Sequence, residues 1–194
     1  MLKRIFIKLF LFAIFYVLFL LGGCSYVPTE VLPEYIHNIY IPVFVNKTSK
    51  YGLEDKLTEA VIDEFLRDGK LGVTNKSEAD GMLLGEIVEY RLEPISYDAN
   101  NVVEQYKLWV VVNLTFWDLK KNEILWRDYR HSVNGGYQGG IEEYVRYYVT
   151  SQAGEVVETE EEAQDRLVQT LSEDIVKRTA YGWKSEIESE LGIQ

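Results

Sequence analysis

Two long stretches of alternating residues near the middle of the chain constrain its fold most strongly. Met82 to Tyr97 and Val102 to Leu119 each predict a long β-strand, and Asp98-Ala99-Asn100-Asn101 predicts the turn between them. Ile124 to His131 predicts a third strand, which completes an antiparallel meander. One face of the second strand is consistently apolar: Tyr106, Leu108, Val110, Val112, Leu114 and Phe116.

The opposite face of that strand is unusual for a surface in contact with water. It includes two tryptophans and a valine, Trp109, Val111 and Trp117. Two interpretations remain open from the residues alone. Either helices cover both faces of the sheet, or this face contacts a partner.

The segments around the meander predict one further strand and two helices. Ile36 to Val45 alternates as a strand, although Pro42 cannot donate to a ladder. Residues 52–68 predict an amphipathic helix that ends at Gly69. Ile62 and Leu66 lie off its apolar stripe, either as scattered surface residues or as a second contact surface. The stripe itself comprises Leu53, Leu57, Ala60, Val61 and Phe65.

A capping box formed by Thr159 and Glu162 predicts the start of the last helix. Apolar residues recur every fourth position from Ala163, and this spacing drifts about 40° per step against a 3.6-residue turn. We therefore expect the packed helix to end or bend near Gly182. Residues 182–194 then form a C-terminal segment with a separate direction.

The N-terminus has the pattern of a bacterial lipoprotein signal. Three basic residues precede an apolar run from Leu9 to Leu21, and the run ends in Leu21-Gly22-Gly23-Cys24. Thirteen apolar residues are too few for a permanent span, which needs roughly 20. Residues 1–23 are thus predicted to be cleaved, and Cys24 is predicted to carry a diacylglycerol and an N-acyl chain. The alternative is an ordinary signal followed by a buried or free cysteine.

The lipid would anchor the chain through a tether, residues 24–35. Ser25 rather than an aspartate follows the cysteine, which favours the outer membrane, with the domain on the periplasmic side. Cys24 is the only cysteine, so no internal disulfide is expected. All 31 acidic but only 17 of the 20 basic residues lie in residues 24–194, a formal charge of −14. Such a domain is not expected to bind nucleic acid.

The residues offer no convincing active site. His37 and His131 lack metal-ligand spacing. Asp128, His131 and Ser132 are the residue types of a catalytic triad, but the sequence motif that surrounds a nucleophilic serine is absent. The glycines between Ser132 and Gly140 do not match a phosphate-binding loop. We expect no catalytic residues, no metal, no cofactor other than the lipid, and no enzymatic activity.

Several short motifs follow one another in a familiar order. They are Ile41-Pro42-Val43-Phe44-Val45-Asn46-Lys47-Thr48, Gly52-Leu53-Glu54, Ala79-Asp80-Gly81-Met82-Leu83-Leu84-Gly85-Glu86-Ile87, and Glu123-Ile124-Leu125-Trp126. Together they resemble the lipopolysaccharide-assembly lipoprotein family, LptE, over residues 24–136 and 163–179. The resemblance implies an α+β two-layer sandwich over residues 36–181, with a mixed, mostly antiparallel four-stranded sheet and two helices on one face.

The LptE resemblance also implies a function. Members of the family plug the outer-membrane β-barrel LptD, help it deliver lipopolysaccharide to the cell surface, and catalyse no reaction. Some contact lipopolysaccharide through basic residues near the hairpin tip, which in this chain is acidic or neutral. The first half of the chain also resembles outer-membrane lipoproteins of the curli-secretion and penicillin-binding-protein-activator types, which act as scaffolds or activators.

Two sets of candidate contact residues follow. For a barrel partner they are Trp109, Val111, Trp117, Ile62 and Leu66, because a plug needs contact surface on many sides. For lipopolysaccharide they are the basic residues of the meander, Arg91, Lys107, Arg127 and Arg130. The alternative is that these four pair with the carboxylates of Glu89, Glu93, Glu104 and Asp128 on a solvated surface.

Overall fold

The computed structural model describes residues 32–133, 136–150 and 156–182. The predicted signal peptide, Cys24, most of the tether and nearly all of the C-terminal segment lie outside these residues. The helices are α2 (Leu53–Asp68) and α3 (Glu160–Tyr181). The strands are β1 (Asn38–Tyr40), β2 (Val45–Asn46), β3 (Gly72–Val73), β4 (Gly81–Tyr97), β5 (Val103–Asp118), β6 (Glu123–Asp128), β7 (His131–Val133), β8 (Gly136–Gln138) and β9 (Ile141–Tyr148).

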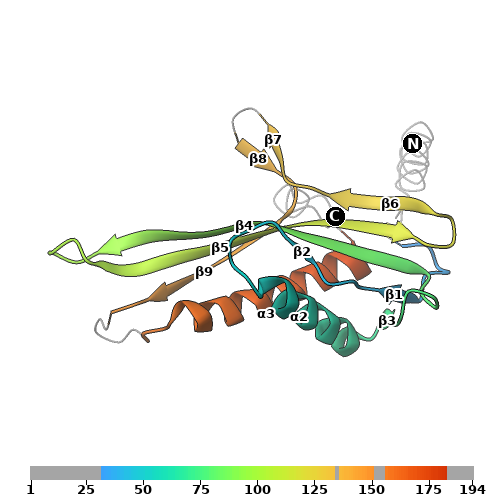
Figure 1. Ribbon diagram of the computed structural model, residues 1–194, viewed down its shortest axis with the longest axis horizontal. Coiled ribbons are helices and arrows are strands. Elements are labelled where there is room, and N and C mark those ends of the chain that lie inside the picture. Colours follow the sequence, from blue (N-terminus) through green and yellow to red (C-terminus); the bar gives the residue numbers. More distant parts are fainter. Residues whose placement is uncertain (1–31, 134–135, 151–155, 183–194) are drawn as a thin grey trace, which may run out of the picture.

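The long antiparallel hairpin of β4 and β5 is the centre of the sheet (Figure 1). On one side, the short strands β1 and β2 pair parallel to β4, and β3 pairs parallel to β1. On the other side, β5 pairs antiparallel with β6 along one half of its length and with β9 along the other. The α+β class and the mixed sheet are confirmed.

The predicted count of four strands is wrong, because the described residues form a main sheet of seven strands. One reason is that β5, at 16 residues, is long enough to pair with two strands end to end. Another is that the predicted strand Ile36–Val45 divides into β1 and β2, with Pro42 between them. A residue without an N–H group interrupts a ladder at that point.

Both helices lie on the same side of the sheet (Figure 1). The core between them and the sheet contains the predicted apolar faces of α2, α3 and β5. Burying these side chains is the main favourable contribution to folding, about 25 cal/mol per Å² of apolar surface. Fully buried members include Leu53, Leu57, Val61, Phe65, Leu108, Val110, Val112, Phe116, Leu167, Leu171 and Ile175.

The helix ends agree with the sequence signals. Gly69 adopts a left-handed conformation at φ 75°, and its N–H donates to the Phe65 carbonyl, which ends α2. Thr159 and Glu162 form the complete capping box at the start of α3. The helix α3 ends at Tyr181, next to Gly182, as the drift of its apolar spacing predicted. Neither α2 nor α3, the two helices in the described part of the chain, has the length and apolarity needed to cross a membrane.

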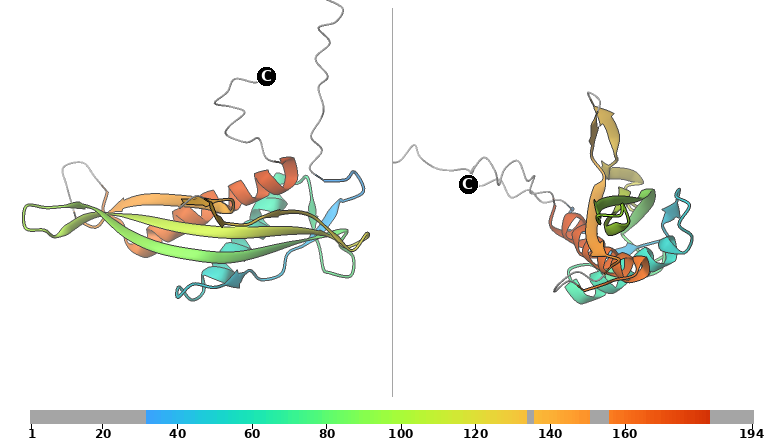
Figure 2. Two further views of the ribbon diagram at one scale, coloured as in Figure 1. Left: turned by 90° about the horizontal axis from the view of Figure 1, so that it is seen from above. Right: turned by 90° about the vertical axis from the view of Figure 1, so that its left-hand side faces the viewer.

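The predicted third strand Ile124–His131 is wrong at its C-terminal end. β6 stops at Asp128, and β7 and β8 form a separate two-stranded hairpin that projects from the sheet (Figures 1 and 2). Side chains near β6 hold the base of this hairpin in place. The Gly140 N–H donates to the Asp128 carboxylate at 2.7 Å, and the Arg130 N–H donates to the Asn113 side-chain oxygen at 2.8 Å.

Candidate binding face of the sheet

The face of β5 that points away from the helices carries the candidate residues, and its neighbours come from β4 and β9. Trp109 lies between Arg91 of β4 and Tyr144 of β9. Lys107 lies between Glu93 of β4 and Arg146 of β9 in the same way. Residues directly opposite one another on adjacent antiparallel strands have side chains close enough to interact.

Aromatic rings and cations alternate across these three strands. The Lys107 ammonium lies 3.6 Å from the centroid of the Trp109 ring and 3.7 Å from that of Tyr144. The guanidinium of Arg91 lies 5.1 Å from the Trp109 ring, and that of Arg146 lies 6.0 Å from the Tyr144 ring. We call these five residues, Arg91, Lys107, Trp109, Tyr144 and Arg146, the cation–aromatic cluster.

Each cation–π contact at an exposed site contributes about 0.5–1 kcal/mol, enough to fix side-chain positions without neutralising a charge. Two carboxylates adjoin the cluster. The Trp109 Nε1–H donates to Glu93 at 3.1 Å, and Arg91 lies 3.3 Å from Glu89. The cluster therefore presents three cations beside two acids on an exposed surface.

The structure confirms that Arg91 and Lys107 are close neighbours. Arg130 lies near Arg91, because both contact the Glu89 carboxylate, whereas Arg127 is separated from them. Arg127 pairs in register with Thr115, which is eight positions along β5 from Lys107, or about 26 Å at 3.3 Å per residue. One phosphate group cannot contact both ends of this span. The prediction of a single four-residue cluster is therefore wrong.

Arg130 pairs with two carboxylates on this face of the sheet. Its Nη1 lies 3.0 Å from a carboxylate oxygen of Glu89 and 3.0 Å from one of Glu142. These two glutamates flank Val111 on the neighbouring strands, so the Arg130 side chain spans the middle of the face. The alternative interpretation, pairing with carboxylates, holds for Arg130 and also for Arg91, which pairs with Glu89.

The predicted barrel-contact residues differ in their exposure to solvent. Val111 has no exposed surface, which removes it from this face as a contact residue. Trp109 and Trp117 are half-buried, and Leu66 is 61% exposed. Ile62 does not face water as expected, because it packs against the core. The helix α2 contacts α3 as well as the sheet side, so its buried arc is wider than a single stripe.

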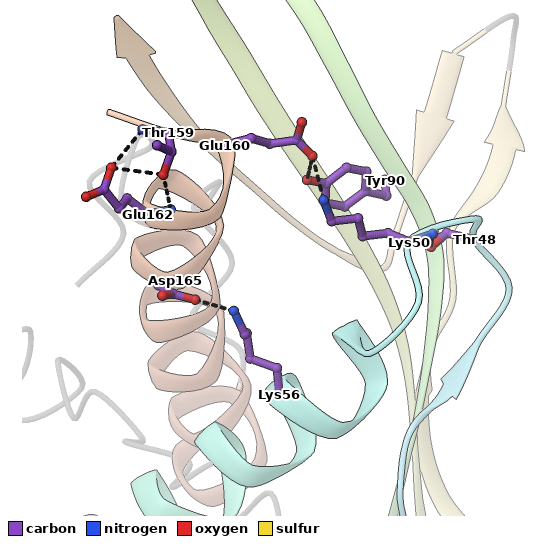
Figure 3. Close-up of polar contacts among 8 residues, drawn as sticks. All are labelled: Thr48, Lys50, Lys56, Tyr90, Thr159, Glu160, Glu162 and Asp165. Carbon is purple, nitrogen blue, oxygen red and sulfur yellow. Dashed lines mark hydrogen bonds and ion pairs between the residues drawn. The ribbon is translucent and has the colours of Figure 1, made fainter. Parts of the chain in front are cut away.

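A second polar group joins three segments on the helical side of the sheet (Figure 3). Glu160 at the start of α3 accepts hydrogen bonds from the Lys50 Nζ at 2.7 Å and the Tyr90 hydroxyl at 2.6 Å. These two hydrogen bonds hold the pKa of Glu160 below its ordinary value. Burial, followed by the Glu160 carboxylate, raises the pKa of Tyr90. Lys56 of α2 pairs with Asp165 of α3 beside it. This group fixes α3 to the sheet.

Asp128, His131 and Ser132 are not assembled into a catalytic triad. The Asp128 carboxylate is engaged by the Gly140 N–H, and the Nδ1 of His131 lies 2.9 Å from the Tyr129 carbonyl oxygen. Across the described residues, no group of three or more His, Cys, Asp or Glu side chains is arranged to hold a metal ion.

Sequence reasoning missed Tyr144 and Arg146, because periodicity alone does not establish the structure of residues 141–150. The available signal was the alternation of buried Ile141, Val145 and Tyr147 with Tyr144 and Arg146. Only the pairing with β5 places these two side chains beside Trp109.

The arrangement is that of a small α+β domain, with two helices on one face of a mixed sheet and basic and aromatic side chains on the other. The family model described as LptE, lipopolysaccharide-assembly, matches residues 36–179. The chain therefore belongs to this family, as its motifs indicated. Membership supports a role in lipopolysaccharide assembly for a lipoprotein of the cell envelope.

Solved structures of similar fold include several lipoproteins, all at low sequence identity. The PelC dodecamer from Paraburkholderia phytofirmans is 10% identical, covers 72% of this chain and 85% of its own, and gives a TM-score of 0.45. A minor lipoprotein from Acinetobacter baumannii is 13% identical, with 75% and 93% covered and a TM-score of 0.44. An uncharacterized lipoprotein B from Nitrosomonas europaea is 14% identical, with 78% and 88% covered and a TM-score of 0.40. No curated protein matches the sequence.

Proposed function

We propose that this chain is an outer-membrane lipoprotein that plugs an LptD-type β-barrel, aids its assembly and helps it deliver lipopolysaccharide to the cell surface. The observation that carries the proposal is the LptE family match over residues 36–179. The chain catalyses no reaction in this role. Lipid on Cys24 holds it at the outer membrane, with the domain on the periplasmic side.

The distribution of partly exposed apolar side chains supports the plug role. Trp109 and Trp117 lie on the sheet face, whereas Leu66 lies on α2 on the other side of the domain. A protein enclosed by a barrel wall is contacted from several directions, so its anchors need not share one patch. Large aromatic residues are typical anchors of such interfaces.

The cation–aromatic cluster is the part of the described surface best suited to lipopolysaccharide. Lipid A carries anionic phosphates, which a domain of net charge −14 repels at long range. The screening length is about 8 Å at physiological salt, so local charges dominate at contact. Arg91 and Arg146 are exposed, and an arginine fork can donate two parallel hydrogen bonds to a phosphate. Arg130 is excluded from this role because Glu89 and Glu142 already balance its charge.

Co-purification tests the partner. The lipidated protein is solubilised from membranes, captured by a C-terminal affinity tag, and its partners are identified by mass spectrometry. The wild type is expected to recover a large outer-membrane β-barrel, and replacing Trp109 and Trp117 by Ala is expected to weaken the recovery. Recovery of a secretion pore or a cell-wall synthase in place of the barrel would support the curli-type or activator-type alternative.

Direct binding tests the lipopolysaccharide contact. A variant with Arg91, Lys107 and Arg146 changed to Gln is compared with a control in which Lys76, Lys121 and Arg127, exposed elsewhere, are changed to Gln. Both variants lose three positive charges. We expect at least tenfold weaker binding for the first and little change for the control. Equal binding by both variants would remove the cluster as the contact site.

Replacing Cys24 by Ala tests the anchor. Without the thiol, no diacylglycerol can be attached. We expect an uncleaved precursor or a mature domain released from the membrane, as measured by membrane fractionation and the mass of the N-terminal peptide. A variant processed and retained in the outer membrane like the wild type would contradict the lipoprotein assignment.

A further inference from the structure

A small hollow lies between the start of α3, the start of α2 and the loop before α2. Its volume is about 300 Å³, at the lower limit of the range for small-molecule sites. It includes no residue of the cation–aromatic cluster and none of the apolar residues assigned to the barrel contact. Six residues line it: Lys50, Tyr51, Gly52, Lys56, Glu161 and Gln164.

Two ion pairs cross beside this hollow. The Lys50 Nζ lies 2.7 Å from the Glu160 carboxylate, and Lys56 pairs with Asp165. Figure 3 shows both pairs, each reaching from α3 to α2 or to the loop before it. Glu160 and Asp165 are five residues apart, or about 7.5 Å along the helix, and the α3 residues of the hollow lie between them. The space therefore suits one small ring, and a longer chain cannot continue along the helices unless the Lys56–Asp165 pair opens.

Gln164 distinguishes this hollow from an ordinary surface depression. It is 5% exposed and lies on the side of α3 that faces α2, one turn before the buried Val168. In the part of the chain that the structure describes, its side-chain amide has no hydrogen-bond partner. An amide offers two donors and an acceptor, and nearly all buried polar groups use at least one of theirs. The free amide therefore indicates a partner that enters through the hollow.

The loop before α2 holds its side of the hollow in a fixed shape. The Asn46 Nδ2 donates to the Lys50 carbonyl at 2.7 Å, and the Asn46 Oδ1 accepts the Thr48 N–H at 2.9 Å. Gly52 leads the chain into α2 with a left-handed φ of 82°. Between these points Tyr51 is held in solvent, with 91% of its surface exposed. A site that is formed before its ligand arrives loses little conformational entropy on binding.

The charges around the hollow disfavour an ionic ligand. Its two lysines are paired with carboxylates of α3, and Glu161 adds a further negative charge. The start of a helix favours an anion, but at α2 the Glu54 carboxylate already takes that position. Hydrogen bonds from its own N–H, from the Asn46 side chain and from the Gly52 N–H hold the pKa of Glu54 below its ordinary value. An anion is therefore repelled by acids and a cation by lysines.

A neutral sugar ring meets these conditions. Each of its hydroxyl groups both donates and accepts, so one ring can satisfy the Gln164 amide, the Lys56 ammonium and the Glu161 carboxylate together. The C–H groups on one face of a sugar pack against aromatic rings, and Tyr51 offers such a ring beside the hollow. A neutral peptide offers similar hydrogen bonds, but it is an extended chain, and the ion pair at Lys56 interrupts its path along the helices.

We propose that the hollow between α2 and α3 binds one neutral sugar ring, either free or at the end of a glycan. Gln164 is the buried hydrogen-bonding group of this site, and Tyr51 is its stacking group. The cation–aromatic cluster lies on the other face of the sheet, away from the helices (Figure 1). The sugar site is therefore separate from that cluster and does not depend on the proposed function.

Saturation-transfer NMR tests the site on the full lipidated chain in a detergent without a sugar head group. The probes are methyl glucoside, methyl galactoside, an N-acetylglucosamine tetrasaccharide, the lipid-free core oligosaccharide of lipopolysaccharide, and an uncharged Gly-Ser peptide with blocked ends. We expect the wild type to bind at least one of the sugars. Gln164→Met and Tyr51→Ala should each bind it at least tenfold more weakly, whereas the controls Gln169→Met and Tyr97→Ala, at exposed positions, should bind it like the wild type. Binding of the tetrasaccharide alone would assign the site to the cell-wall glycan, and binding of the core oligosaccharide alone would assign it to lipopolysaccharide.

Thermal unfolding separates binding from a structural role of Gln164. Methionine has the length of glutamine without its amide, so Gln164→Met should be at least as stable as the wild type when no sugar is present. Saturating sugar should raise the Tm of the wild type and leave that of the variant unchanged. The proposal would be overturned by no binding of any sugar, by binding of the peptide alone, by equal affinities of Gln164→Met and Gln169→Met, or by a lower Tm of Gln164→Met without sugar.

Discussion

Replacing Asp80 by Asn should destabilise the domain in a way that depends on pH. The Asp80 carboxylate accepts the N–H groups of His37 and Asn38, both at 2.9 Å, and lies 2.7 Å from the Lys120 Nζ. Its backbone N–H donates to the Asn38 carbonyl, and its carbonyl accepts from the Leu119 N–H. One residue thus holds together the segment before β1, the start of β4 and the turn after β5.

The size of the expected destabilisation follows from how strongly folding favours the ionised form of the Asp80 carboxylate. Burial alone would raise the pKa of Asp80, but the hydrogen bonds from Lys120, His37 and Asn38 outweigh burial and lower the pKa to about 2. The ordinary value is about 3.9, and each pKa unit corresponds to about 1.4 kcal/mol. The charged form therefore contributes between about 2 and 3 kcal/mol to the free energy of unfolding, a change of roughly 5–10 °C in Tm for a domain of this size.

The sign of the pH dependence is fixed because the pKa is lower in the folded state. The stabilisation is fully present above about pH 5 and is lost progressively as the pH falls through about 2. Thermal unfolding followed by circular dichroism at pH 7 and pH 2.5 should show a gap of several degrees between wild type and Asp80→Asn that closes in acid. Asp63→Asn, at an exposed position on α2, is the control and should change Tm little. A gap of equal size at both pH values would refute the reasoning.

Two further predictions concern packing and the polar group on the helical side. A Cβ added at Gly85 would lie 2.6 Å from the Cγ of the buried Phe44 ring, so Gly85→Ala should cost about 1–3 kcal/mol. Adding Phe44→Leu should recover part of that loss, and purely additive effects in urea unfolding would contradict the contact. Tyr90→Phe and Glu160→Gln remove the two partners of one hydrogen bond. A double-mutant cycle should give a coupling free energy of about 1 kcal/mol, and a value near zero would mean that the hydroxyl does not stabilise α3 on the sheet.

The sequence alone determined the elements whose signals are local. Strict alternation identified the apolar face of β5, and those side chains form the core. Gly69 and the pair Thr159 and Glu162 marked helix ends correctly, because capping depends on residues within one turn of the helix. The order of short motifs identified the LptE family, which the match over residues 36–179 confirms.

The tertiary structure alone decided which side chains share the outer face of the sheet. Alternation places Trp109 and Val111 on that face, but it does not indicate which strands lie beside them. The pairing of β5 with β9 adds Tyr144 and Arg146 to the cation–aromatic cluster, and the bridge from Arg130 to Glu89 and Glu142 spans the position of the buried Val111. These neighbours are distant in sequence and meet only through strand pairing. That pairing is selected by the packing free energy of the whole sheet, which no local pattern encodes.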